Sequence, residues 1–317
     1  MKLAILDDYQ RVALTLADWS SLRDRVEITV FDRHLGAEDA VARALAEFEI
    51  VCIMRERTPF PASLFERLPR LKLVVTTGRR NAAVDLAAAA RHRVAVCGTG
   101  SPGHATGELA FALILSLARN LLAEANSVRA GGWQVGIGRD LHGAVLGIIG
   151  LGNIGAQIAG FGRAFGMELL AWSQNLTEAR AAEVGARRTA KDELLAGADF
   201  VTIHLRLSPR TRSLIGAREL GLMRKDAYLI NTSRGPIVDE AALLDALHSG
   251  RIAGAGLDVF DHEPLPADHP LRTAPNTVLT PHIGYVTSAS YTRFYQDAVE
   301  DIAAFLRGEP LRILNAT

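Results

Sequence analysis

Cysteine is scarce in this sequence, and an excess of charge of one sign is missing. Only Cys52 and Cys97 occur, each within an apolar, strand-like stretch, so we expect two buried, reduced thiols and no disulfide. Lys plus Arg number 35, and so do Asp plus Glu. This balance provides no electrostatic footprint for a polyanion. We therefore expect no nucleic-acid partner and no anionic membrane partner.

Long apolar runs are also missing. The longest, Leu109–Leu122, is interrupted by polar residues and falls short of the roughly 20 residues that span a bilayer. It predicts one long packed helix. The apolar stretch Leu3–Leu6 is followed by two aspartates, so it is too short for a secretory signal and predicts a first core strand. We expect a cytoplasmic protein.

Spacings that bind metals are missing as well. The histidines at these positions show no paired ligand spacing with cysteines or carboxylates: His34, His92, His104, His142, His248, His262 and His269. We predict no metal site. Asp7-Asp8 resembles a carboxylate pair for metal or acid chemistry, but capping and solvation explain it more simply.

Strand and helix patterns alternate along the 317 residues, of which 49% are apolar. This pattern predicts two α/β domains with doubly wound parallel sheets. The Gly98–Gly103 linker separates two series of strands, and a helix near Thr287–Leu306 returns to the first domain. The strands are predicted at Leu3–Leu6, Ile50–Met54, Leu73–Thr76 and Val94–Cys97, then at Val145–Ile149, Leu169–Trp172, Phe200–His204, Ala227–Asn231, Ala255–Val259 and Val278–Leu279.

The most informative segment is a strand that runs into a glycine-rich turn and then a helix. Val145–Ile149 is the strand and Ala156–Phe165 lies in the helix, whose positive N-terminus attracts phosphate. Glycines at the turn let the backbone approach a dinucleotide pyrophosphate; the alternative is a purely structural turn. The predicted contacts are Gly150, Leu151, Gly152, Asn153, Ile154 and Gly155.

From the linker to Gly284 the chain resembles the D-isomer-specific 2-hydroxyacid dehydrogenases. The resemblance implies NAD(H) or NADP(H), an active site between two domains, and a homodimer built through the nucleotide domains. It also implies a Rossmann domain at residues 99–284, inserted into a discontinuous flavodoxin-like substrate domain at residues 1–98 and 285–317. The matching segments are Leu146–Gly155, Leu229–Gly235, Gly254–Phe260, Glu263-Pro264 and Thr280–Gly284.

The family's catalytic residues fall on Arg234, Glu263 and His282. Reduction of a 2-keto acid needs a proton donor beside the carbonyl oxygen, and histidine suits that role. A carboxylate on the far imidazole nitrogen fixes the tautomer. A guanidinium grips the substrate carboxylate and polarises the carbonyl. Taken singly, each residue has a structural alternative: an ion pair on the surface, a solvated loop charge or a satisfied histidine.

The resemblance also implies cofactor contacts beyond the glycine turn. Asp258 matches a residue that binds the nicotinamide amide, although a strand-end cap is the alternative. Ser173 stands where NAD specificity usually requires an acid, so we expect NADP to be tolerated. The remaining cofactor contacts are expected at Gln174, Leu205, Thr232, Ser233 and Gly284.

The predicted substrate contacts are Arg55, Gly78, Arg79 and Arg80, in addition to Arg234. Arg80 replaces a second glycine of many relatives, so the arginine pair either adds positive charge for a doubly anionic acid or faces solvent. Tyr285 replaces another glycine, where it either narrows the pocket or packs.

Together these features predict an enzyme that reduces a small 2-keto acid, such as glyoxylate or hydroxypyruvate, to its D-2-hydroxy acid. Phosphoglycerate dehydrogenase activity is an alternative, although many such relatives carry a further C-terminal domain. Formate dehydrogenases place glutamine at the position of Glu263 and are disfavoured. A dinucleotide-sensing corepressor is the alternative from another class, and the intact catalytic trio argues against it.

Overall fold

The computed structural model describes residues 1–315. The chain forms two compact units: unit 1 comprises residues up to Pro102 and from Val286 onward, and unit 2 is Gly103–Tyr285. The predicted boundaries, after residues 98 and 284, lie four residues and one residue before these limits.

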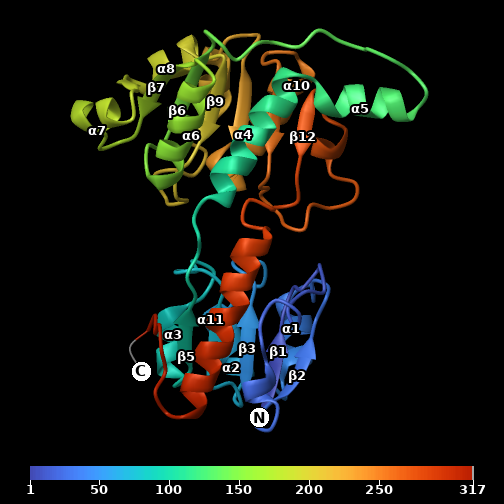
Figure 1. Cartoon of the computed structure of the whole chain (residues 1–317), viewed down its shortest axis with the longest axis vertical. Coiled ribbons are helices and arrows are strands. Elements are labelled where there is room, and N and C mark those ends of the chain that lie inside the picture. Colours follow the sequence, from blue (N-terminus) through green and yellow to red (C-terminus); the bar gives the residue numbers. More distant parts are fainter. Residues whose placement is uncertain (316–317) are drawn as a thin grey trace. The chain divides into compact units, whose positions relative to one another are not determined.

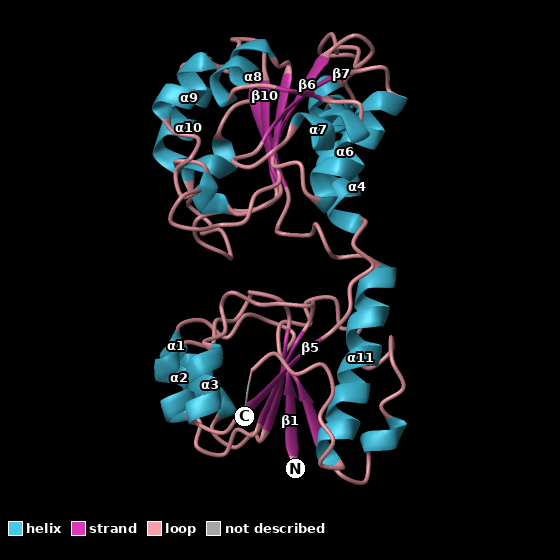
Figure 2. Ribbon diagram, turned by 90° about the vertical axis from the view of Figure 1, so that its left-hand side faces the viewer, coloured by secondary structure: helices cyan, strands magenta, loops and turns pink. Residues whose placement is uncertain are grey.

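Unit 1 is a five-stranded parallel sheet in the order β2-β1-β3-β4-β5. This is the flavodoxin-like strand order. Helices α1, α2 and α3 cover one face of the sheet and α11 covers the other (Figure 2). The elements are β1 (Lys2–Ile5), β2 (Glu27–Val30), α1 (Glu38–Leu45), β3 (Ile50–Ile53), α2 (Ala62–Arg67), β4 (Leu73–Thr76), α3 (Leu86–Arg91), β5 (Ala95–Gly98) and α11 (Ser288–Leu306).

Unit 2 is a seven-stranded parallel sheet in the order β12-β11-β10-β9-β6-β7-β8. Counted from β6, this is the Rossmann order with one further strand. Helices α4, α6 and α7 lie on one face, and α8, α9 and α10 on the other (Figure 2). The strands are β6 (Val145–Ile149), β7 (Glu168–Trp172), β8 (Arg187–Arg188), β9 (Phe200–Ile203), β10 (Tyr228–Asn231), β11 (Gly254–Leu257) and β12 (Thr277–Leu279), and the helices are α4 (Ala105–Ala118), α5 (Leu121–Arg129), α6 (Asn153–Ala164), α7 (Glu178–Glu183), α8 (Lys191–Gly197), α9 (Ala217–Leu222) and α10 (Glu240–His248).

The α/β fold class and the two parallel sheets agree with the prediction, and all ten predicted strands are present. The sequence pattern did not predict two strands, β2 and β8, and both lie at sheet edges. β2 is partly exposed along its length and β8 is a pair of exposed arginines. Edge strands bury little apolar surface, so their sequences lack the continuous apolar run of a central strand.

The predicted single helix at Leu109–Leu122 is wrong. The structure has two helices there, α4 and α5, because Asn120 adopts a left-handed conformation with φ of 51° and breaks the helix. Within residues 1–315, no single helix is long and apolar enough to cross a membrane. The α4–α5 pair together passes that test by length and composition, with a bend of 65°.

Cys52 and Cys97 are both free and buried, as predicted. They lie on β3 and β5 of unit 1. Burial raises the pKa of each thiol to about 12, so both stay protonated and unreactive near neutral pH.

Candidate active site

The predicted cofactor contacts gather at the carboxyl edge of the sheet in unit 2. They lie in the turn between β6 and α6, in the first turn of α6, and in the loops after β7, β9, β10, β11 and β12. Strand order reverses between β6 and β9. In open α/β sheets such a switch point is where ligands bind.

The glycine turn is built so that two glycines are sterically required. Gly150 has φ of 103°, and a Cβ there would lie 2.5 Å from the carbonyl oxygen of His204. A Cβ on Gly155 would overlap the carbonyl oxygen of Gly150. Gly152 is different, because a Cβ there would meet nothing within 4 Å. The first and third glycines therefore close the turn, and the second leaves open space.

Several groups at this edge have no partner and suit a dinucleotide. The amide N–H groups of Gly152, Asn153 and Ile154 donate to no group among the described residues, and they begin the 12-residue helix α6. The hydroxyl of Thr232 is buried without a hydrogen-bond partner in the same part of the chain. Leu205 reaches the turn from the β9 loop, since its side chain would contact a Cβ on Gly150 at 2.9 Å.

Ser173 follows β7 beside the glycine turn. Its hydroxyl accepts a 2.9 Å hydrogen bond from the amide of Leu151, so the side chain supports the turn itself. Gln174, the next residue, is exposed. Neither residue is an acid, so this position places no negative charge against a 2′-phosphate.

A buried asparagine shapes the loop that carries Arg234. Asn231, at the end of β10, donates from its amide to the carbonyl of Arg234 at 2.9 Å and accepts from the amide of Ser233 at 3.0 Å. The hydroxyl of Ser233 donates to the carbonyl of Ile203 on β9 at 2.6 Å. The half-buried Arg234 donates to the carbonyl of Ser233 at 2.7 Å. These bonds hold the guanidinium at the sheet edge.

Gly235 brings this loop against the loop after β11. A Cβ on Gly235 would overlap the backbone of Phe260 and Asp261, so only glycine fits. The amide of Phe260 in turn donates to Glu263 Oε1 at 2.9 Å. The backbone that follows Arg234 is thus packed directly on the loop that holds Glu263.

Glu263 and His282 form a close pair. Oε2 of Glu263 lies 2.5 Å from Nδ1 of His282, and both side chains are partly buried. The carboxylate holds Nδ1 as a donor, which leaves Nε2 as the imidazole nitrogen that can exchange a proton with a ligand. The ring of Tyr285 packs edge-on against the His282 ring at a centroid distance of 5.5 Å, so in unit 2 this tyrosine packs on the histidine.

Asp258 anchors the turn on which His282 sits. It is fully buried and accepts from the hydroxyl of Thr280 at 2.6 Å and from the amides of Ile283 and Gly284, each at 2.8 Å. His282 has φ of 54°, a strained conformation for a residue with a side chain. Burial raises the pKa of Asp258, and the three hydrogen bonds oppose that shift. In this structure Asp258 acts as the strand-end cap.

His204, at the end of β9, was given no role from the sequence. Its amide donates to the carbonyl of Ile149 at 2.7 Å, and its Nε2 lies 2.9 Å from the hydroxyl of Thr202. Its Nδ1 is buried without a partner. Burial lowers the pKa of His204 to about 3, so the imidazole is neutral and packs beside the glycine turn.

This shift predicts acid sensitivity. The unfolded chain binds a proton at His204 below the ordinary histidine pKa of about 6.5, but the folded protein does so only near pH 3. The stability that the neutral His204 contributes is therefore fully present above pH 6.5, and it is lost as the pH drops toward 3. We expect the midpoint temperature of thermal unfolding to decrease as the pH is lowered from about 6.5 to 5. The decrease per pH unit should be smaller in His204→Asn. Equal slopes for both proteins would show that His204 does not cause the loss.

The predicted substrate contacts at the amino-terminal end of the chain belong to unit 1. Arg55 follows β3 with φ of 53°, and its Nη1 donates to the carbonyl of Thr77 at 3.3 Å. Gly78 follows β4 with φ of 92°, and a Cβ there would overlap the Arg55 guanidinium. The amide of Gly78 donates to the hydroxyl of Thr99 at 2.7 Å. Arg79 and Arg80 are exposed.

Four residues that support the site were given no role from the sequence: Asn231, Gly235, Thr280 and His204. Asn231 and Gly235 lie within the Leu229–Gly235 segment, and Thr280 directly precedes Pro281. Their roles depend on contacts between loops that are distant in sequence, which a single sequence does not display. Over residues 1–315, no group of three or more His, Cys, Asp and Glu side chains is arranged to hold a metal ion.

A parallel sheet with a glycine turn at its switch point, and a paired histidine on a neighbouring loop, defines a dinucleotide-dependent oxidoreductase. Comparisons with known proteins agree with this class. Residues 111–284 match the model of the D-isomer specific 2-hydroxyacid dehydrogenase NAD-binding domain. The chain is 39% identical to a glyoxylate reductase of Aeropyrum pernix, over 91% of this chain and 90% of the relative.

Two further relatives cover nearly the whole chain. A hydroxypyruvate reductase of Blautia hydrogenotrophica is 32% identical, over 99% of this chain and 100% of the relative. The crystal structure of a phosphoglycerate oxidoreductase from Vibrio cholerae O395 superposes with a TM-score of 0.92 at 36% identity, covering 97% of this chain and 99% of that one.

The chain belongs to the D-isomer specific 2-hydroxyacid dehydrogenase family. It is an NAD-dependent oxidoreductase that acts on CH–OH groups and transfers a hydride between the nicotinamide and a 2-keto or 2-hydroxy acid. The predicted family, fold class and NAD(H) cofactor are confirmed.

Proposed function

We propose that this protein reduces a small 2-keto acid to its D-2-hydroxy acid, with His282 as the acid and base, Glu263 as its partner and Arg234 as the substrate-binding cation. The observation that carries the proposal is the 2.5 Å pair between His282 Nδ1 and Glu263 Oε2. The proposed cofactor contacts are residues of unit 2, and the further substrate contacts that we propose are Arg55, Gly78, Arg79 and Arg80.

His282 supplies the proton in this reaction. With Nδ1 held by Glu263, its Nε2 carries the proton that passes to the carbonyl oxygen as the alkoxide forms. Glu263 accepts from Nδ1 and so holds the ring in the tautomer and orientation that present Nε2 to the substrate. In the reverse direction Nε2 accepts the hydroxyl proton. The bound dinucleotide supplies or accepts the hydride at its nicotinamide ring.

Arg234 binds and polarises the substrate. Its planar guanidinium can hold the substrate carboxylate and the carbonyl oxygen together. Negative charge on that oxygen grows during the reaction, so a fixed cation there stabilises the transition state more than the bound substrate. The hydrogen bonds of Asn231 keep this loop in place before substrate arrives.

The substrate is expected to be a small 2-keto acid of the glyoxylate and hydroxypyruvate type, since two of the relatives that match most of the chain carry those names. The test is a panel of 2-keto acids assayed by the absorbance of the reduced nicotinamide. Turnover of one or more acids, lost in His282→Ala, supports the proposal. Cofactor binding without turnover of any acid would instead favour a dinucleotide sensor.

We expect both NADH and NADPH to support turnover, because Ser173 places no carboxylate against the 2′-phosphate. Ser173→Asp should lower kcat/KM for NADPH by about tenfold or more while NADH use persists, since the new carboxylate can still accept the amide of Leu151. Asn175→Asp, two residues further along, is the control. A wild-type enzyme that already strongly prefers NADH would contradict this expectation.

A homodimer is expected through unit 2. Half of the exposed large apolar side chains of residues 1–315 lie in α5 and the segment after it: Leu121, Leu122, Val128, Trp133, Val135 and Ile137. Trp133 is 74% exposed and Ile137 is 97% exposed. α5 projects beyond the sheet of unit 2 (Figure 1). Apolar surface gathered in this way marks a protein interface.

Negative charge introduced into the apolar surface of α5 and the segment after it should separate the subunits of the dimer. We expect Trp133→Glu combined with Ile137→Glu to sediment as a monomer at concentrations where the wild-type protein is a dimer, because each carboxylate would have to be buried unpaired. Leu14→Glu, at a 51% exposed leucine of unit 1, is the control. A dimer that survives the double substitution would place the interface elsewhere.

A further inference from the structure

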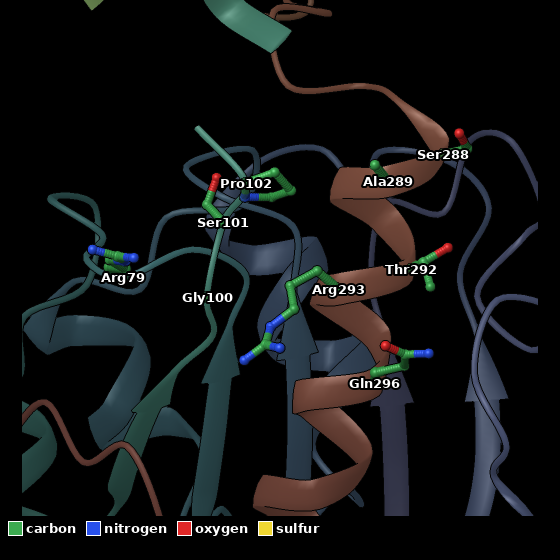
Figure 3. Close-up of a pocket in the computed structure, with 9 residues that line it drawn as sticks. All are labelled: Arg79, Gly100, Ser101, Pro102, Ser288, Ala289, Thr292, Arg293 and Gln296. Carbon is green, nitrogen blue, oxygen red and sulfur yellow. The ribbon is translucent and has the colours of Figure 1, made fainter. Parts of the chain in front are cut away.

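A hollow of about 600 Å³ lies within unit 1, beside the first turns of α11. It is lined from three segments: the loop after β4, the segment after β5, and α11 (Figure 3). Its volume lies in the range of sites for small molecules. The polar side chains that line it are Arg79, Ser101, Ser288, Thr292, Arg293 and Gln296.

The lining is cationic, and most of its donors are unused. Two of the six polar side chains are guanidiniums, and no carboxylate lines the hollow. Nε of Arg293 bonds to Asp297, and otherwise none of the six side chains has a hydrogen-bond or ion-pair partner among residues 1–315. Donors that the protein leaves unpaired around one hollow are available to a ligand.

Arg293 is held in place by the residues behind it. Its Nε donates to Asp297 Oδ2 at 3.0 Å, and the amide of Gly100 donates to the same oxygen at 2.7 Å. Asp297 is 1% exposed. A Cβ on Gly100 would lie 2.9 Å from Arg293 Nε, so glycine makes room for the guanidinium to lie across the segment after β5. Figure 3 shows Arg293 extending from α11 toward that segment. The terminal nitrogens are thereby oriented without being used.

We propose that this hollow binds the anionic group, a carboxylate or a phosphate, of a small molecule. Guanidinium and hydroxyl donors recognise these anions, and a guanidinium fixed by a buried carboxylate loses little freedom on binding. The anion has two possible sources: the distal group of a doubly anionic 2-keto acid, which rests on the proposed function, or a free anion. The lining residues are distinct from Arg234, Glu263 and His282.

The first experiment measures binding without catalysis. Inorganic phosphate is titrated into the full chain by calorimetry at constant ionic strength. Arg79→Gln and Arg79→Gln combined with Arg293→Gln should weaken binding by about tenfold or more, with Arg91→Gln, at an exposed arginine on α3, as the charge-matched control. Arg79 is exposed and has no ion pair within residues 1–315, so its single variant tests the site without risk to folding. Equal phosphate affinity in wild type and both variants overturns the proposal.

The second experiment separates the two sources. The KM of Arg79→Gln is measured for a 2-keto acid with one carboxylate, glyoxylate, and for one with two, 2-oxoglutarate or oxaloacetate. A KM raised only for the dicarboxylic acid identifies the substrate's distal group. Weaker phosphate binding with both KM values unchanged identifies a free anion. If no acid is turned over, the proposed function fails, while phosphate binding in wild type and in His282→Gln still decides the anion site.

Discussion

Replacing His282 by glutamine is expected to lower kcat by about 100- to 10,000-fold while dinucleotide affinity stays unchanged. Glutamine can occupy the same space and donate a hydrogen bond, but it cannot give up a proton to the forming alkoxide. Apart from Gly284, the contacts proposed for the dinucleotide lie on other loops, so its binding persists. Steady-state kinetics with the preferred 2-keto acid, together with fluorescence titration of the reduced dinucleotide, measure both quantities.

The chain offers a matched control for this substitution. His269 also faces a carboxylate, with its Nε2 3.0 Å from Glu240 Oε1, yet it lies outside the proposed site. His269→Gln should leave kcat near the wild-type value. Glu263→Gln should reduce kcat by less than His282→Gln, because the imidazole remains. A His282→Gln enzyme with near-normal turnover would remove this residue from the mechanism.

Alanine substitutions at two glycines of the same turn should have different effects, one on stability and the other on dinucleotide binding. A methyl group on Gly155 would overlap the carbonyl of Gly150, which is itself held by the turn, so Gly155→Ala should destabilise the protein by roughly 1–3 kcal/mol. A methyl group on Gly152 meets nothing within 4 Å. Gly152→Ala should therefore change stability by less than about 1 kcal/mol but weaken dinucleotide binding, because the methyl group fills the space left open beside the unpaired amides.

Chemical denaturation and dinucleotide titration of both variants make the comparison. Gly160→Ala is the control, since a Cβ there also meets nothing within 4 Å and the residue lies two turns into α6, away from the amides. It should alter neither stability nor affinity adversely. If Gly152→Ala bound dinucleotide as tightly as the wild-type protein, the pyrophosphate would not approach this turn.

The central strands were predictable because a buried parallel strand must be apolar along its whole length. Ile50–Ile53 and Phe200–Ile203 are fully buried, and their sequences carry that signature. Asn120 was not predictable as a helix break, because its neighbours on both sides favour helix and only the left-handed backbone at that residue separates α4 from α5. The edge strand β8 is two exposed arginines, a pattern that resembles any polar loop.

The proposed catalytic trio shows the same division. Matching sequence segments identified Arg234, Glu263 and His282. They did not identify the contacts that hold these residues in place. Gly235 is required by the backbone of Phe260, and Asp258 caps the turn that holds His282 in its left-handed conformation. Such requirements exist only once loops from β10, β11 and β12 lie side by side.

The sequence by itself determined the α/β class, the glycine turn and its helix, the family and the chemistry of the candidate residues, because apolar periodicity and short motifs are local properties of the chain. Only the tertiary structure decided the remaining features: Asp258 as a cap, Tyr285 packed on His282, the neutral His204 and the cationic hollow in unit 1. Each depends on burial and on contacts between residues that are distant in sequence, and these arise only when the sheets assemble.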